Sequence, residues 1–183
     1  DFDAFYKVMT KAYENIYARL GIGDITHFCE ASGGDISKYS HEFQTLSEIG
    51  EDTLLYDPKS DTWYNDEVAP SKASEWTNPD EAKAKREDVI GKGLIGVEAL
   101  ATFFDIPVEK TTKTILFENE KNAVIAAVVR GDRDVNELKL KEVAGCDRLR
   151  LASEETVKRI TGADIGYAGP LNLPDEVSIY WDD

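Results

Sequence analysis

The sequence has 183 residues, a formal charge of −15 at pH 7 and 42% hydrophobic residues. This length allows one large domain or two small ones, and the acidity excludes a sequence-blind nucleic-acid coat protein, which needs a basic surface. The apolar runs are too short to span a membrane, and we identify no export signal. Two cysteines, Cys29 and Cys146, make no disulfide framework, which favours a reducing, cytoplasmic setting. Because an amphipathic pattern already runs at Asp1, we expect a piece of a longer protein.

The first 56 residues predict a helix followed by antiparallel strands. Apolar residues recur with a helical period over 2–20, and Gly21 is suited to end that helix. Polar and apolar residues then alternate, as in half-buried strands, at 24–31 and 41–49, and residues 53–56 are a candidate third strand.

The composition changes at about Asp57. Residues 57–92 are polar and carry three of the six prolines, with acidic side chains at their start. This pattern predicts a connector, and its tryptophans indicate that it packs on other parts of the chain. A helix is predicted near residues 80–88.

Residues 93–183 predict a compact α/β unit. The run 123–129 is apolar throughout, so we expect a central strand covered on both faces. The predicted elements are a helix ending before Pro107, strands at 112–118 and 122–130, a helix opened by a capping box of Asp134 and Glu137 and ending near Gly145, a strand at 148–151, a helix from Ser153 to Gly162, and a strand at 177–181.

Four motifs in order resemble those of bacterial prolyl-tRNA synthetases. They are Gly33-Gly34 with Ser40-His41-Glu42-Phe43-Gln44 and Gly50-Glu51-Asp52; the stretch from Pro107 to Leu116; Arg130-Gly131-Asp132 with Asn136-Glu137; and Gly166-Tyr167-Ala168-Gly169-Pro170 before Leu173-Pro174. The resemblance implies an α/β (α+β) chain in three parts. These are a partial antiparallel class II catalytic core at 1–56, a connector at 57–92, and a C-terminally incomplete editing domain of the aminoacyl-tRNA deacylase type at 93–183.

The resemblance also implies the activity. A parent of this family attaches proline to tRNA(Pro) with ATP and Mg²⁺, but its motif 2 arginine and motif 3 are expected outside this chain. The inserted domain hydrolyses mischarged alanyl-tRNA(Pro) and needs no cofactor. The implied partners are the acceptor end of tRNA(Pro), alanine or proline as the aminoacyl group, and a second parent subunit in a homodimer, with no membrane or DNA.

Lys113 is the residue on which the expected deacylation chiefly depends. The resemblance implies that the lysine of this Lys-Thr pair is required for deacylation, in which it holds the terminal adenosine or its phosphate. Thr114 is expected to bind substrate beside it. The alternative for Lys113 is a solvated lysine on a strand, which is the reading that we retain for Lys110.

The Gly166–Pro170 bend corresponds to the family's Gly-x-x-x-Pro loop, with Gly166, Gly169 and Pro170 assigned to the catalytic site. Its backbone amides and carbonyls can fix an ammonium and an ester without charged side chains. The alternative is an ordinary turn. We expect Lys113 and this bend to meet across a cavity that fits a methyl group and excludes the proline ring by hard contact.

Four further residues are assigned to substrate binding. Arg130 and Asp132 either reach a tRNA phosphate or pair with each other. His41 and Glu42 would lie at the prolyl-adenylate pocket of the parent, with Glu42 near the imino group, or else pair across the sheet. No metal site is expected, because the histidines and cysteines lack ligand spacing.

Two alternatives to a cis-editing domain remain open. One is a freestanding aminoacyl-tRNA deacylase, against which the synthetase-like first 56 residues count. The other is a non-catalytic tRNA-docking insertion, because Gly91 stands where the family often has threonine and because the chain is strongly acidic. A histidine that contributes to the family's editing site is expected beyond Asp183.

Overall fold

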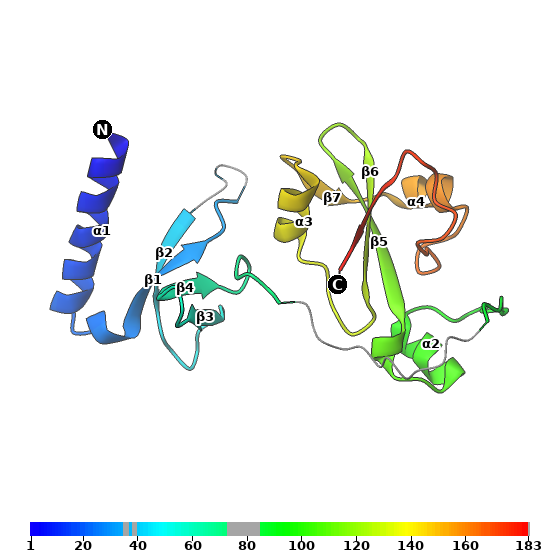
Figure 1. Ribbon diagram of the computed structural model, residues 1–183, viewed down its shortest axis with the longest axis horizontal. Helices are drawn as coiled ribbons and strands as arrows, with labels where there is room; N and C mark the ends of the chain where they lie inside the picture. Colours follow the sequence, from blue (N-terminus) through cyan, green and yellow to red (C-terminus); the bar gives the residue numbers. More distant parts are fainter. Residues whose placement is uncertain (35–36, 38–39, 73–84, 183) are drawn as a thin grey trace. The chain divides into compact units, whose positions relative to one another are not determined.

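The computed structural model describes residues 1–34, 37, 40–72 and 85–182, and the chain divides into two compact units, Asp1–Ser71 and Lys72–Asp183 (Figure 1). The first unit thus extends beyond residue 56, where the sequence suggested that a connector begins. Of the helix expected at 80–88, residues 80–84 lie outside the described part and residues 85–88 form no helix. None of the helices in the described ranges is long and apolar enough to cross a membrane.

The first unit has one long helix and, within the described residues, one sheet of four strands in the order β2-β1-β4-β3. The helix is the one predicted, and its first turn is capped by the Asp1 carboxylate, which accepts from the Asp3 backbone N–H. Strand β1 pairs antiparallel with β2, as predicted, but parallel with β4, so the sheet as a whole is mixed and not antiparallel throughout. The elements are α1 (Phe2–Arg19), η1 (Gly23–Ile25), β1 (Thr26–Ala31), β2 (Ser40–Thr45), β3 (Leu54–Asp57) and β4 (Thr62–Asn65).

Strand β4 lies in the segment expected to be a connector, and its hairpin with β3 explains the acidic residues there. The Asp57 carboxylate accepts from the Lys59 backbone N–H at 2.9 Å and from the Ser60 hydroxyl at 2.9 Å. The Tyr56 hydroxyl donates to Asp61 at 2.7 Å, and Asp61 has a φ of 53°. These aspartates are turn residues. The hairpin joins the first sheet through β4, which accounts for both the longer unit and the parallel pairing.

The second unit is the mixed α/β unit predicted from the sequence. Its sheet, among the described residues, has the order β7-β5-β6-β8, with β6 paired antiparallel to β5 and parallel to β8. The elements are α2 (Val97–Phe104), η2 (Val108–Lys110), β5 (Thr112–Asn119), β6 (Val124–Arg130), α3 (Glu137–Ala144), β7 (Leu149–Leu151), α4 (Glu154–Thr161) and β8 (Ser178–Trp181).

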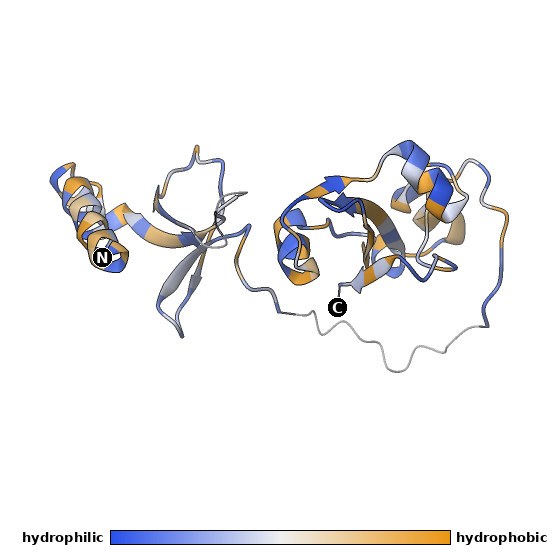
Figure 2. Ribbon diagram, turned by 90° about the horizontal axis from the view of Figure 1, so that it is seen from above, coloured by the Kyte–Doolittle hydropathy of each residue, from blue (hydrophilic) through white to orange (hydrophobic). Residues whose placement is uncertain are grey.

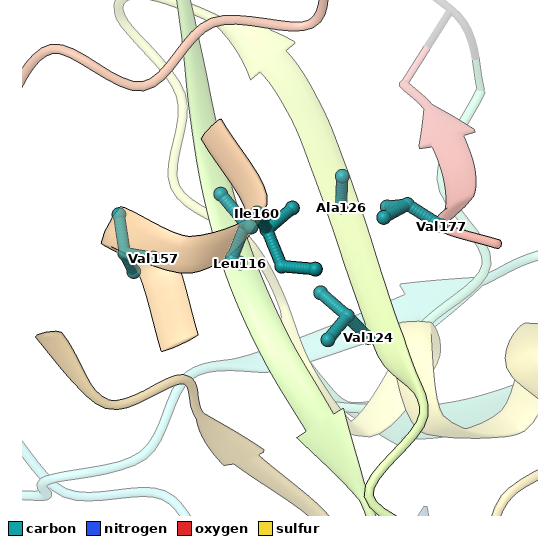
Figure 3. Close-up of a cluster of buried hydrophobic side chains, with 6 residues drawn as sticks. All are labelled: Leu116, Val124, Ala126, Val157, Ile160 and Val177. Atoms are coloured by element: carbon teal, nitrogen blue, oxygen red, sulfur yellow. The ribbon is translucent and has the colours of Figure 1, made fainter. Parts of the chain in front are cut away.

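Strand β6 is the central apolar strand that the sequence predicted, with Val124 to Val129 all buried. Its alternate side chains enter two apolar clusters on opposite faces of the sheet. Figure 2 shows the hydrophobic colour of the ribbon in the middle of this sheet. One cluster packs against Val157 and Ile160 of α4 (Figure 3), and the other against Leu140 of α3. The sheet is therefore covered on both faces, which explains the continuous apolar run.

Helix α3 is capped by a different residue from the one expected. The Asn136 side chain accepts from the Lys139 backbone N–H at 3.0 Å, so Asn136 and not Asp134 is the N-cap. The Asp134 carboxylate binds Lys113 instead. The predicted cap of α4 is confirmed, since the Ser153 hydroxyl accepts from the Thr156 backbone N–H at 3.1 Å.

A buried carboxylate ties β5, β7 and α4 together. Glu118 accepts the Thr156 hydroxyl at 2.6 Å and two guanidinium N–H groups of Arg150 at 2.9 and 3.2 Å. The hydroxyl of Thr156, and after it the charge and hydrogen bonds of Arg150, outweigh desolvation and hold the pKa of Glu118 below its usual range.

Replacing Glu118 by glutamine is expected to lower the free energy of unfolding at pH 7 by about 1.5–3 kcal/mol, because charge-assisted hydrogen bonds to a buried group are lost. Since the folded-state pKa is depressed, the contribution of the carboxylate is present above the ordinary glutamate pKa and is lost as pH falls through the folded value. Denaturant unfolding of both proteins across this range checks the result. Arg150→Gln, at a side chain 65% exposed, is the control and should cost less. A difference between wild type and Glu118→Gln that stays constant on acidification would contradict the assignment.

Candidate functional site

Successive residues of β5 point to opposite faces of the second sheet. Ile115 and Phe117 pack in the cluster that contains Leu140 of α3. Leu116 packs in the cluster that contains Val157 of α4. By this alternation Lys113 shares the α3 face and its neighbour Thr114 shares the α4 face.

Lys113 is held by an ion pair. Its ammonium Nζ donates to Asp134 Oδ1 at 2.7 Å, and the lysine side chain is 27% exposed whereas that of Asp134 is 97% exposed. A pair with so exposed a carboxylate contributes at most about 1 kcal/mol. The lysine can therefore exchange this carboxylate for a phosphate or another anion at little cost.

Thr114 carries an unsatisfied polar atom. Its hydroxyl Oγ1 is buried and has no hydrogen-bond partner among the described residues. A buried hydroxyl without a partner costs about 1–3 kcal/mol, so such atoms are uncommon in folded proteins unless they serve a ligand or an ordered water. This hydroxyl lies on the α4 face, opposite Val128 of β6.

The Gly166–Pro170 loop is anchored on the same α4 face. Ala168 packs against the cluster of Leu116 and Val157. Gly166 has a φ of +92°, and a Cβ there would lie 2.7 Å from Ile95 Cγ2, so glycine is required both by the backbone and by space. The Gly93 backbone N–H donates to the Tyr167 hydroxyl at 3.0 Å, which ties the loop to the segment before α2.

Gly169 differs from Gly166. A Cβ at Gly169 would meet no described atom within 4 Å, and its φ is outside the left-handed range. The fold therefore does not require glycine at this position. A ligand that approaches the backbone closely would require it. Pro170, which follows, is half-buried.

The structure brings Thr114 and the Gly166–Pro170 loop to one face of the sheet, but it places the Lys113 side chain on the other. Lys113 is the second residue of β5, so it lies at the end of the sheet where β5 begins. A substrate that touches both Lys113 and the loop would have to reach both faces of the sheet. Their common cavity stays a prediction.

Arg130 and Asp132 pair with each other. The guanidinium donates to both carboxylate oxygens, at 2.6 and 2.8 Å, and this pairing holds the pKa of Asp132 below its usual range. Between them, Gly131 is in tight contact with the turn before β5. A Cβ at Gly131 would lie 2.0 Å from Thr111 Oγ1 and 2.6 Å from the Val108 carbonyl oxygen.

His41 and Glu42 are adjacent on β2 and point to opposite faces of the first sheet. The His41 ring stacks on Phe28 at 4.6 Å, and its nitrogens lie 2.8 Å from the Tyr6 hydroxyl and 3.3 Å from Glu30 Oε1. His41 thus packs under α1, and the structure does not bring it together with Glu42.

Glu42 lies on the face of the first sheet away from α1. Its carboxylate accepts from Gln44 Nε2 at 2.8 Å, and the same amide donates to Asp52 at 2.9 Å. Two carboxylates that share one amide donor suit an ammonium group, whereas they repel a phosphate.

No group of three or more His, Cys, Asp or Glu side chains that could hold a metal ion occurs in the part of the chain that the structure describes. Burial raises the pKa of the Cys29 thiol and of the Cys146 thiol, which disfavours the thiolate that binds metal.

Sequence reasoning missed Tyr167, which the loop holds at its surface, and the packing role of Gly131. The signal for Tyr167 was an aromatic residue between the glycines of a polar bend. The signal for Gly131 was a glycine directly after a strand, which often marks a close approach of two backbone segments.

Comparison with known proteins gives the class of the second unit. Residues 93–183 match the family model described as the aminoacyl-tRNA editing domain. Residues 93–183, which lie in the second unit, are therefore similar to aminoacyl-tRNA editing domains. The curated relatives that the chain matches are all of one kind among those given below, namely proline–tRNA ligases. The chain is 36% identical over 180 residues to the proline–tRNA ligase of Bacillus cereus (strain B4264), and equally to that of Bacillus mycoides (strain KBAB4).

These alignments cover 98% of this chain but only 31% of each ligase. The chain thus spans about a third of the length of the curated relatives it matches. Among solved structures, one described as a candidate trans-editing enzyme for prolyl tRNA synthetase is similar with a TM-score of 0.44 and 24% identity, over 48% of this chain and 55% of that one.

Proposed function

We propose that the second unit hydrolyses the aminoacyl ester of mischarged tRNA, that its substrate is alanyl-tRNA(Pro), and that its parent is a proline–tRNA ligase. The observation that carries the proposal is the match of residues 93–183 to the editing-domain family. The alignment with proline–tRNA ligases over 180 residues, which includes the first unit, supports an inserted domain over a freestanding deacylase. We expect the parent to be a cytoplasmic homodimer with tRNA(Pro) as its RNA partner.

The reaction needs one water and no cofactor. A water oxygen attacks the ester carbonyl carbon, and the bond from that carbon to the ribose oxygen breaks. The ribose oxygen takes a proton and leaves as the hydroxyl of the terminal adenosine, while the amino acid leaves as a carboxylate and its proton goes to solvent. Because the ester is already activated, the site mainly has to position ester and water.

The proposed roles follow the two faces of β5. Lys113 leaves Asp134 and binds a phosphate of the acceptor end, because its exposed ion pair is weak. On the α4 face, Thr114 Oγ1 and the backbone of the Gly166–Pro170 loop hold the aminoacyl group. Selection against proline is steric, by a pocket too small for the ring.

The first unit supports fewer functional assignments than the second. Beside Glu42 the structure places a second carboxylate, that of Asp52, and such a pair suits the ammonium of an amino acid better than the triphosphate of ATP. The ATP and Mg²⁺ proposed for the parent are therefore not assigned to residues of this chain.

Replacing Thr114 by valine removes the unpaired hydroxyl and keeps the shape. We expect the free energy of unfolding to stay constant or rise, while hydrolysis of alanyl-tRNA(Pro) falls about 2- to 12-fold through the loss of one neutral hydrogen bond. The matched control is Thr111→Val, which loses the 2.7 Å bond from Thr111 Oγ1 to the Val108 carbonyl and should be less stable. If Thr114→Val is destabilised as much as Thr111→Val, the Thr114 hydroxyl has a partner inside the fold.

The proposal is tested by incubating the 183-residue chain with alanyl-tRNA(Pro). The experiment measures both the binding of the RNA and the release of alanine. Turnover above the spontaneous rate is the expected result. Binding without turnover would instead favour a tRNA-docking insertion, and the absence of both would remove the editing role from this chain.

A further inference from the structure

The aromatic ring of Tyr167 is held in place at the surface of the Gly166–Pro170 loop. The residue is 42% exposed, and its hydroxyl accepts the Gly93 backbone N–H at 3.0 Å. The preceding Gly166 is fixed by its positive φ and by its contact with Ile95, and the following Ala168 packs into the α4-side cluster. Both ends of the tyrosine are thus anchored, so the exposed ring costs little further conformational entropy when a ligand binds.

The surroundings of this ring have the features of a single-stranded RNA site. Gly169 opens onto free space two residues along the loop. The exposed Lys92 directly precedes Gly93, the residue that holds the tyrosine hydroxyl. Proteins that bind single-stranded nucleic acid combine an aromatic ring, on which a base stacks, with a nearby cation for the backbone.

We propose that Tyr167 is the stacking platform for the terminal adenine of the aminoacyl-tRNA acceptor end. The inference rests on the proposed function, since it takes the Gly166–Pro170 loop to border the ester. The adenine lies on the tyrosine ring, and the open backbone at Gly169 admits the ribose and the ester beside it. Tyr167 then binds the nucleoside, and selection of the amino acid belongs to other groups.

A purely structural role for Tyr167 makes different predictions. If only its hydroxyl matters, through the bond to Gly93, then Tyr167→Phe should be as impaired as Tyr167→Leu. If stacking matters, Tyr167→Phe keeps the ring and the function, whereas Tyr167→Leu loses both. Tyr167→Trp supplies a larger ring and serves as a second test in case the leucine variant does not fold.

The experiment measures binding of two minihelices of the tRNA(Pro) acceptor stem by fluorescence anisotropy with the intact 183-residue chain. Both carry alanine through a stable amide, and one has an abasic terminal nucleotide. We expect the wild type, Tyr167→Phe and Tyr167→Trp to bind the adenine-terminated minihelix about tenfold or more tighter, and Tyr167→Leu to show no preference. Thermal unfolding establishes that each variant is folded.

Equal binding of the two minihelices by the wild type, or a preference retained by a folded Tyr167→Leu, would overturn the proposal. Loss of the preference in Tyr167→Phe would overturn it in favour of the hydroxyl anchor. Because the amide cannot be hydrolysed, these results do not depend on turnover. A wild type that binds the adenine-terminated minihelix more tightly but releases no alanine from the ester would contradict the proposed function. The stacking inference would then still hold.

Discussion

Lys113→Ala is expected to lower the rate of alanyl-tRNA(Pro) hydrolysis by about 10- to 150-fold, which corresponds to one charge-assisted hydrogen bond to a phosphate. The free energy of unfolding should fall by no more than about 1 kcal/mol, because the ion-pair partner of the lysine among the described residues is the exposed carboxylate of Asp134. Single-turnover hydrolysis and denaturant unfolding, measured on the same preparations, separate the two effects.

Asp134→Asn is the matched control for the lysine variant. It removes the same ion pair and leaves the ammonium of Lys113 free, so hydrolysis should be unchanged or faster. If Asp134→Asn and Lys113→Ala lose activity equally, the ion pair itself is what matters and Lys113 has no part in binding RNA. Unchanged hydrolysis by Lys113→Ala would remove it from the mechanism altogether.

Gly131→Ala is expected to lower the free energy of unfolding by about 3 kcal/mol, the upper end of the usual cost of forced overpacking. The new Cβ would lie 2.0 Å from Thr111 Oγ1 and 2.6 Å from the Val108 carbonyl oxygen, and a backbone oxygen cannot move without displacing the turn before β5. The melting temperature and the denaturant midpoint measure this loss.

Gly169→Ala is the matched control for Gly131→Ala, because it adds the same methyl group where the surrounding space is open. No described atom lies within 4 Å of its new Cβ, so its stability should match that of the wild type. If the two alanine variants are equally stable, the close approach at Gly131 is not a constraint on the fold.

The second unit was predictable because its signals are local. Ser153 caps α4, Gly145 and Gly162 end helices with positive φ, and the apolar run of β6 marks a strand covered on both faces. The first unit was less predictable, because the pairing of β4 with β1 joins segments far apart in the chain. The acidic and polar residues of the turn at Asp57 have the composition of a connector, so the sequence did not reveal the β3-β4 hairpin.

The candidate site was predictable as a set of residues and less so as an arrangement. The motifs include Lys113, Thr114 and the Gly166–Pro170 loop, but the face on which each side chain lies depends on the packing of the whole sheet. Adjacent residues of a strand must point apart, so the Lys113-Thr114 pair cannot act from one side. The same rule separates His41 from Glu42 on β2.

The most direct test of editing by this chain is the ratio of its hydrolysis rates on alanyl-tRNA(Pro) and prolyl-tRNA(Pro), each corrected for spontaneous hydrolysis. We expect release of alanine well above the spontaneous rate and no release of proline above it. Equal release of the two amino acids, or release of neither, would contradict a site that removes the wrong amino acid and spares the correct one.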